Sequence, residues 1–233
     1  MIEDWSRTAE QIMLSTVENN IRILAITSPA GRTGVSTVAQ GLAAAFAQSG
    51  RKTVLIDLSA TARHNAKAVA WSPDEPLRPE LIHSGNDNLA MLAAAPPPAA
   101  RPLFNNVAGL QTAFRRDFAQ YETIIIDLPA VGAETTDAVN PIAVARAADA
   151  VFIVAPTGAT VRGDLTAVAS QLRQVGAPLA GVIMNDRDCQ TLGEAIAQVA
   201  STRLGANFPR AAHWIASKAL ASTYLSRNFR IAT

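Results

Sequence analysis

The chain has 233 residues, a formal net charge of +1, and 49% hydrophobic against 17% charged residues. This composition excludes intrinsic disorder, and the small net charge gives no uniform basic surface for nucleic acid. One cysteine excludes an internal disulfide, and the three histidines show no metal-ligand spacing. Because no signal-peptide core or long apolar stretch occurs, we expect a soluble, cytoplasmic protein without a transmembrane segment.

Short apolar, β-branched runs alternate along the chain with longer segments of helical composition. The predicted strands are 21–28, 53–59, 123–129, 150–156 and 179–185. The predicted helices are 36–49, 105–119, 137–148, 162–175, 191–202 and 211–226. The alternation predicts an α/β fold, with a mainly parallel sheet of about seven strands and helices on both faces. We expect one domain over 1–233, with 211–233 as a C-terminal helix and tail.

Two segments interrupt this alternation. Residues 71–88 are rich in Pro, Asp and Asn, which predicts a loop with at most one helical turn. Residues 93–102, AAAPPPAARP, predict a short polyproline II stretch that serves as a rigid connection or as a PxxP-type ligand.

A small-residue loop follows the first predicted strand and leads into a helix. It consists of Gly31, Arg32, Thr33, Gly34, Val35, Ser36 and Thr37. Backbone N–H groups and the helix dipole make such a loop an anion site, and Ser36 stands where a Walker A hydroxyl binds Mg²⁺. Val35, however, stands where Walker A has its lysine, a loss that weakens triphosphate binding and phosphoryl transfer. Whether the neighbouring Arg32 lends its charge instead is left open by the sequence, because an arginine there need not adopt the same geometry.

Two aspartates end predicted strands, Asp57 after TVLI and Asp127 after TIII. Each alone is compatible with a carboxylate that caps the following turn. Ligands of open α/β sheets bind at the carboxyl ends of the strands, so these aspartates and the phosphate loop together favour a metal–nucleotide pocket.

Three blocks, in this order, resemble the bacterial tyrosine kinases and related polysaccharide co-polymerase ATPases of the MinD/ParA class. They are ITSPAGRTGVST with the following TVLID, YETIIIDLPAV with the following AVFIVAP, and GVIMN. The likeness spans about residues 8–200. It implies ATP or ADP bound with Mg²⁺ by residues 31–37, and Ser36, Asp57 and Asp127 as metal ligands. It also implies catalytic roles for Asp57 and Asp127, and contact of Asn185 with adenine.

The departures from the family pattern concern catalysis. Val35 replaces the lysine, Ala30 stands where MinD/ParA proteins carry a second lysine, and Ser59 replaces an aspartate. The active kinases carry a C-terminal tyrosine cluster as their autophosphorylation substrate, whereas Tyr224 is the only tyrosine here after Tyr121. Asp137 matches the aspartate of a DA pair that follows the second block.

The resemblance implies a degenerate, pseudokinase-like subunit that regulates or scaffolds exopolysaccharide or capsule synthesis and export, with little or no phosphotransfer. Its expected partner is an inner-membrane polysaccharide co-polymerase or chain-length protein, with homo-oligomers and peripheral membrane association also open. One alternative is an active MinD/ParA-type ATPase that dimerises on ATP and positions a partner at the membrane or cell pole. Another is an interaction module with a vestigial pocket.

Overall fold

The computed structural model describes residues 2–59, 68–78, 82–86, 88–132, 139–157, 162–185, 213–215 and 217–218. The chain divides into two compact units, one of residues 1–155 and 160–184 and one of residues 156–159 and 185–233. The predicted helix 191–202 and Asp137 lie outside the described residues, and of 211–226 only 213–215 and 217–218 are described, as helical. A single domain over the whole chain stays a prediction.

Seven strands form one sheet in the order β3-β4-β2-β5-β1-β6-β7. They are β1 (Ile23–Thr27), β2 (Thr53–Asp57), β3 (His83–Asn86), β4 (Leu89–Ala93), β5 (Thr123–Asp127), β6 (Ala150–Pro156) and β7 (Leu179–Asn185). The ladders that join β1, β2, β4, β5 and β6 are parallel, and β3 is antiparallel to β4. The predicted mainly parallel α/β sheet is therefore confirmed.

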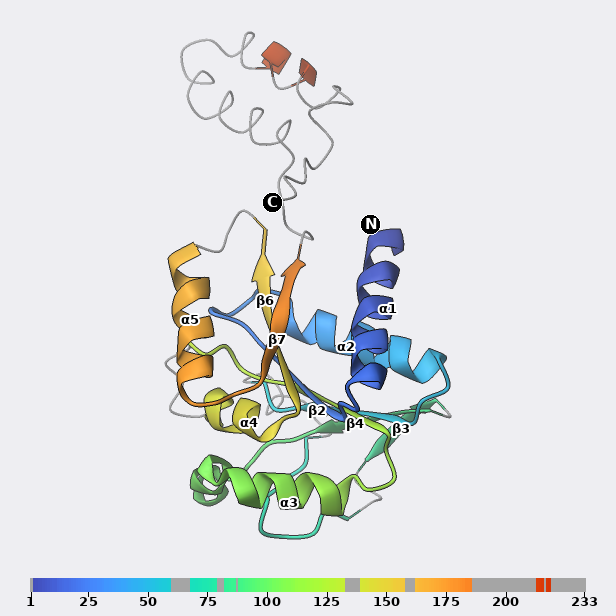
Figure 1. The fold of residues 1–233 in the computed structure, drawn as a ribbon, viewed down its shortest axis with the longest axis vertical. Coiled ribbons are helices and arrows are strands. Elements are labelled where there is room, and N and C mark those ends of the chain that lie inside the picture. The colour runs from blue at the N-terminus through green and yellow to red at the C-terminus, as the bar shows by residue number, and fades with distance from the viewer. Residues whose placement is uncertain are drawn as a thin grey trace. The chain divides into compact units, whose positions relative to one another are not determined.

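Helices cover both faces of this sheet, as predicted (Figure 1). They are α1 (Ile2–Glu18), α2 (Val35–Gln48), the 3₁₀ helix η3 (Pro98–Asn105), α3 (Val107–Asp117), α4 (Pro141–Ala147) and α5 (Arg162–Gln174). One apolar cluster joins the sheet to α1 and α2, and a second joins it to α3, α4 and α5. Among the described helices, none is both long and apolar enough to cross a bilayer.

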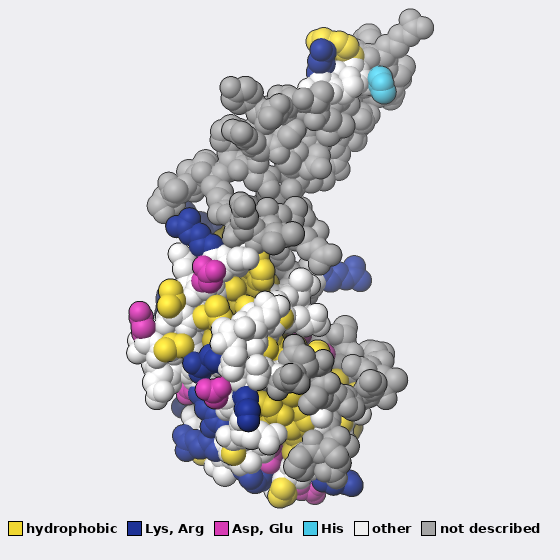
Figure 2. All heavy atoms as spheres, turned by 90° about the vertical axis from the view of Figure 1, so that its right-hand side faces the viewer, with side chains coloured by type: hydrophobic (Ala, Val, Ile, Leu, Met, Phe, Trp, Pro, Cys, Tyr) yellow, Lys and Arg dark blue, Asp and Glu magenta, His cyan; other side chains and the backbone are white. Residues whose placement is uncertain are grey.

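Helix α1 lies against α2 through a close contact between an indole ring and a glycine. A Cβ added at Gly41 would lie 2.7 Å from the Trp5 ring, so a larger residue there would displace the ring. The outer side of α1 leaves Leu14 and Val17 largely exposed, at 63% and 57%. Figure 2 views the molecule from the side of α1 and shows hydrophobic side chains among Lys, Arg, Asp and Glu, consistent with the balanced net charge.

The sequence predictions for the segments 71–88 and 93–102 were partly wrong. Residues 83–86 form the short edge strand β3, and polar HSGN carries no apolar alternation that would announce it. Residues 98–105 form η3 instead of continuing a polyproline II stretch. Proline fixes φ near −65°, a value that both conformations share, so proline alone does not distinguish them.

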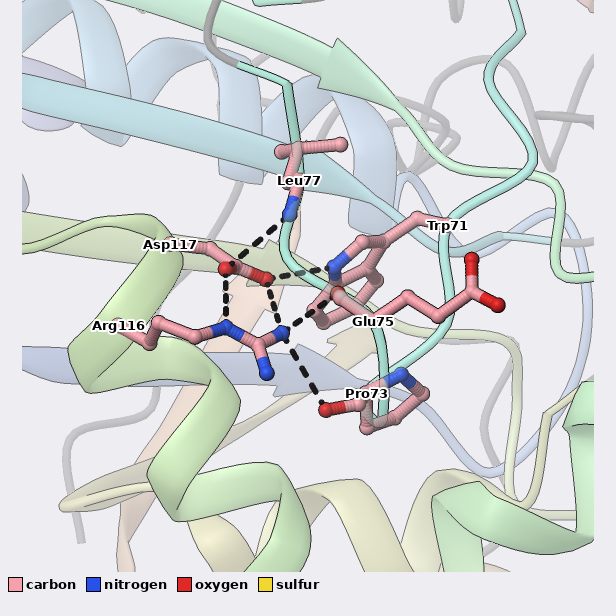
Figure 3. Close-up of polar contacts among 6 residues, drawn as sticks. All are labelled: Trp71, Pro73, Glu75, Leu77, Arg116 and Asp117. Atoms are coloured by element: carbon pink, nitrogen blue, oxygen red, sulfur yellow. Dashed lines mark hydrogen bonds and ion pairs between the residues drawn. The ribbon is translucent and has the colours of Figure 1, made fainter.

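A buried carboxylate fastens the loop 71–77 to the end of α3 (Figure 3). Asp117 accepts hydrogen bonds from Trp71 Nε1 at 3.0 Å and from the Leu77 backbone N–H at 3.2 Å, and it pairs with the Arg116 guanidinium. Arg116 also donates to the carbonyls of Pro73 and Glu75. The Trp71 ring packs against three phenylalanines of the core, namely Phe104, Phe114 and Phe118. This part of the predicted loop is therefore firmly anchored.

Candidate functional site

The predicted phosphate loop lies between β1 and α2, at the carboxyl edge of the sheet and near its middle, because β1 pairs with β5 and β6. Gly34 is the N-cap of α2, has a φ of 89° and offers no side-chain cap. The first N–H groups of α2 therefore remain available to a ligand at this end of the helix.

The residues that lead from β1 into the loop are held by the segment that follows β5. The backbone N–H groups of Val131 and Gly132 donate to the carbonyls of Ser28 and Pro29, at 2.8 and 3.2 Å. A Cβ at Gly132 would lie 2.6 Å from the Pro29 oxygen, so glycine is required at this close approach. The phosphate loop and the segment after Asp127 are thus directly linked through their backbones.

The two strand-end aspartates are register partners on neighbouring parallel strands, β2 and β5. Such strands lie about 4.8 Å apart, and paired residues point to the same face. Asp57 and Asp127 continue the row of Leu55 and Ile125, which belongs to the cluster beneath α2. The Ser36 side chain lies close enough to Asp127 to lower the pKa of its carboxyl. The structure therefore brings Ser36, Asp57 and Asp127 together, and their metal-binding roles stay predictions.

Asp127 is 3% exposed, and its Oδ1 has no hydrogen-bond partner among the described residues. The pKa of this carboxyl is raised to about 7, chiefly by burial; the Ser36 side chain lowers the pKa, and the charge of Asp57 raises it. Ionised Asp127 is thus costly in this position unless a cation compensates its charge.

This arrangement fits a magnesium ion that arrives with a nucleotide. The site offers an unpaired carboxylate oxygen and a hydroxyl, and oxygen ligands of this kind suit Mg²⁺. No group of three or more His, Cys, Asp or Glu that could hold a metal occurs in the described parts of the chain. Phosphate oxygens and water would therefore complete the coordination, as is usual for this ion.

Asp57 also serves the turn that follows its strand, as its alternative interpretation predicted. Its Oδ1 accepts a hydrogen bond from the Ser59 N–H at 2.9 Å. The turn-capping role and a place beside Asp127 are therefore compatible in one side chain.

Val35 does not occupy the loop as a lysine would. Its side chain is only 9% exposed and belongs to the apolar cluster of α1 and α2, together with Ile12 and Leu42. The position that carries the phosphate-binding charge in Walker A motifs is therefore part of the hydrophobic core in this protein.

Arg32 has a feature that the sequence did not predict. Its φ is 61°, in the left-handed region, whereas Gly31 has no positive φ and a Cβ there would meet nothing within 4 Å. The left-handed conformation in this part of the loop thus belongs to Arg32 and not to Gly31. A left-handed conformation costs a non-glycine residue roughly 1–2 kcal/mol. The signal that could have revealed it is the family pattern PGEGKST, in which a glycine stands at this position.

The remaining predicted residues differ in how they relate to the loop. Thr33 is buried and Thr37 is exposed at the start of α2. Asn185 ends β7, and its backbone carbonyl accepts a hydrogen bond from the Thr157 backbone N–H at 3.0 Å. It belongs to the second compact unit, so its contact with adenine stays a prediction.

Solved structures with the same arrangement of strands and helices are P-loop proteins. The kinase domain of the Escherichia coli tyrosine kinase ETK aligns with a TM-score of 0.63 and 22% identity, over 77% of this chain and 74% of that one. The septum site-determining protein MinD of Pyrococcus horikoshii, complexed with Mg-ADP, aligns with a TM-score of 0.53 and 21% identity, over 72% of each chain. The chain thus has a P-loop NTPase-like α/β fold.

Sequence similarity narrows this class to one family. The tyrosine-protein kinase CpsD of Streptococcus agalactiae is 30% identical over 198 residues, which cover 78% of this chain and 81% of CpsD. No family model matches the chain. The chain belongs to the bacterial tyrosine kinase family that includes CpsD, which confirms the resemblance inferred from the three sequence blocks.

Proposed function

We propose that the chain is a degenerate member of this family that binds Mg²⁺ with ATP or ADP but transfers phosphate weakly or not at all. It acts as a regulatory or scaffolding subunit in exopolysaccharide or capsule synthesis. Its partner is a polysaccharide co-polymerase or chain-length protein of the inner membrane, to which it docks peripherally from the cytoplasm.

One observation supports this proposal: the oxygen-bearing side chains of Asp57 and Asp127 are paired at the strand ends, while the lysine position belongs to the core. Ser36 and Asp57 both act on the pKa of Asp127, Asp57 is its register partner, and Val35 is packed among apolar side chains. Bound Mg²⁺ would neutralise phosphate charge here. Ser36 and Asp127 would hold the ion, and the N–H groups at the start of α2 would bind phosphate oxygens. The γ-phosphate, which the Walker A lysine normally contacts, loses that contact.

The test is calorimetric titration of Mg·ATP and Mg·ADP into the wild-type protein, Val35→Lys and Asp127→Asn. We expect wild-type binding with little preference for ATP, and loss of Mg²⁺-dependent binding in Asp127→Asn. Val35→Lys should bind ATP about tenfold or more tightly than the wild-type protein, because a charge-assisted contact contributes at least about 1.5 kcal/mol. An assay with radiolabelled ATP should show no phosphotyrosine in the wild-type protein. Rapid phosphotransfer, or no nucleotide binding at millimolar concentration, would contradict the proposal.

The same protein samples distinguish our proposal from the alternative of an active MinD/ParA-type ATPase. That function requires dimerisation on ATP, so light scattering should show a dimer with Mg·ATP and a monomer with Mg·ADP. Under our proposal the two nucleotides give the same oligomeric state.

A further inference from the structure

The phosphate loop holds an arginine in a backbone conformation that suits glycine better. Of the described non-glycine residues, only Asn20 and Arg32 have a positive φ. Asn20 follows the C-terminus of α1, where asparagine commonly adopts this conformation. Arg32 has no such local reason, and strained backbone of this kind points to a functional constraint.

The Arg32 side chain is exposed and forms no hydrogen bond or ion pair with the rest of the described protein. By contrast, Arg22, Arg51 and Arg116 all donate to backbone or side-chain oxygens. Arg32 thus combines a costly backbone conformation with a guanidinium that stabilises nothing in the described structure.

The surrounding site has a matching deficit of positive charge. Asp57 and Asp127 bring two carboxylates, Asp127 Oδ1 lacks a partner, and the lysine position is filled by buried Val35. A nucleotide adds further negative charge from its phosphates. Arginine is well suited to this task, because its planar guanidinium binds phosphate through two parallel hydrogen bonds.

We propose that Arg32 supplies the phosphate-binding charge that Val35 does not, so that this loop binds the phosphates of a magnesium-bound nucleoside diphosphate or triphosphate through an arginine. The inference rests on the proposed nucleotide binding and adds to it the residue on which affinity depends. The N–H groups of the helix N-terminus and of the loop orient the phosphates. The guanidinium of Arg32, which belongs to the same loop, neutralises the negative charge of the phosphates.

Two substitutions separate the charge of Arg32 from its backbone conformation. Arg32→Gln removes the charge and keeps the backbone cost, whereas Arg32→Gly removes both. We expect calorimetry to show about ten- to a hundredfold weaker binding of Mg·ADP and Mg·ATP in both variants, the range for a charge-assisted hydrogen bond. Arg32→Gly should melt no lower than the wild-type protein, since glycine suits this φ. Arg32→Lys should retain part of the affinity.

Arg115→Gln is the matched control, because Arg115 is exposed on α3, on the opposite face of the sheet. It should bind both nucleotides like the wild-type protein. The affinity of the wild-type protein should also fall more steeply with added salt than that of Arg32→Gln.

The outcomes distinguish this inference from the proposed function. Wild-type binding that both Arg32 variants retain overturns the role of Arg32 and leaves nucleotide binding intact. If nucleotide binding is lost in Arg32→Gln but kept in Arg32→Gly, the charge is not needed, because both variants lack it. Loop geometry then decides binding, and this result also overturns the inference. Absence of wild-type binding overturns both proposals together.

Discussion

At the scale of single residues, the site is defined by which charges are buried and which are missing. Asp127 is a buried carboxylate, and the lysine position of the loop is taken by Val35, whose side chain belongs to the apolar core. The metal-free site is therefore destabilised by its own carboxylate, a cost that a divalent ion with nucleotide would remove.

This cost makes the stability of the metal-free protein depend on pH. The folded pKa of Asp127 is about 7 and the unfolded value is 3.8. Between these values the unfolded chain loses its proton while the folded one keeps it, so stability falls as pH rises toward 7 and is then constant. Relative to Asp127→Asn, we expect the wild-type protein to lose up to about 4 kcal/mol between pH 4 and 8.

Urea unfolding in EDTA across this pH range measures the difference between the two proteins. Glu10→Gln, which changes an exposed carboxylate of α1, should follow the wild-type profile. Parallel profiles for the wild-type protein and Asp127→Asn would show that Asp127 ionises normally in the fold.

At the scale of elements, the loop 71–77 depends on one side chain of α3. Asp117 accepts from Trp71, Leu77 and Arg116, so Asp117→Asn replaces one acceptor oxygen by a donor that faces other donors. We expect a loss of about 1–3 kcal/mol of stability in urea unfolding. Trp71→Phe keeps an aromatic ring in the phenylalanine cluster. Because the Asp117 carboxylate holds the loop mainly through its hydrogen bonds, we expect Trp71→Phe to lose less stability than Asp117→Asn.

Arg115→Gln serves again as the control, and its stability should lie within about 0.5 kcal/mol of the wild-type value. A larger loss in Trp71→Phe than in Asp117→Asn would mean that ring packing anchors this loop rather than the hydrogen bonds.

At the scale of the whole molecule, the described members of both apolar clusters belong to the first compact unit. The members of both apolar clusters lie between residues 5 and 183, and β7 ends at Asn185. We therefore expect a protein of residues 1–185 to retain the sheet and to unfold in urea as one cooperative transition. A gradual, non-cooperative loss of circular dichroism would show that residues 186–233 are needed for folding.

The sequence predicted those elements whose residue types suit only one structure. Strands such as TIIID are continuously apolar and β-branched, and their carboxyl ends correctly indicated that Asp57 and Asp127 lie together. Strand β4 was missed because LAMLA is composed mainly of residues that favour helices, and pairing with β2 decides its structure.

Details of the phosphate loop depended on its surroundings. Gly34 has a positive φ, which glycine adopts readily, whereas nothing in the identity of Arg32 announces a left-handed backbone. Likewise, the burial of Val35 depends on α1 covering α2, which a local pattern does not reveal.

The place of β1 inside the sheet has a consequence for partial unfolding. Strands β3 and β7 form the two edges, while β1 has hydrogen-bonded neighbours on both sides. Local opening of a sheet starts where backbone amides have the fewest partners, so the edges exchange their amide hydrogens before the centre does. The phosphate loop thus follows a strand in the part of the sheet that opens last. A molecule in which β3 or β7 has locally unfolded therefore retains the strand that positions its proposed nucleotide site.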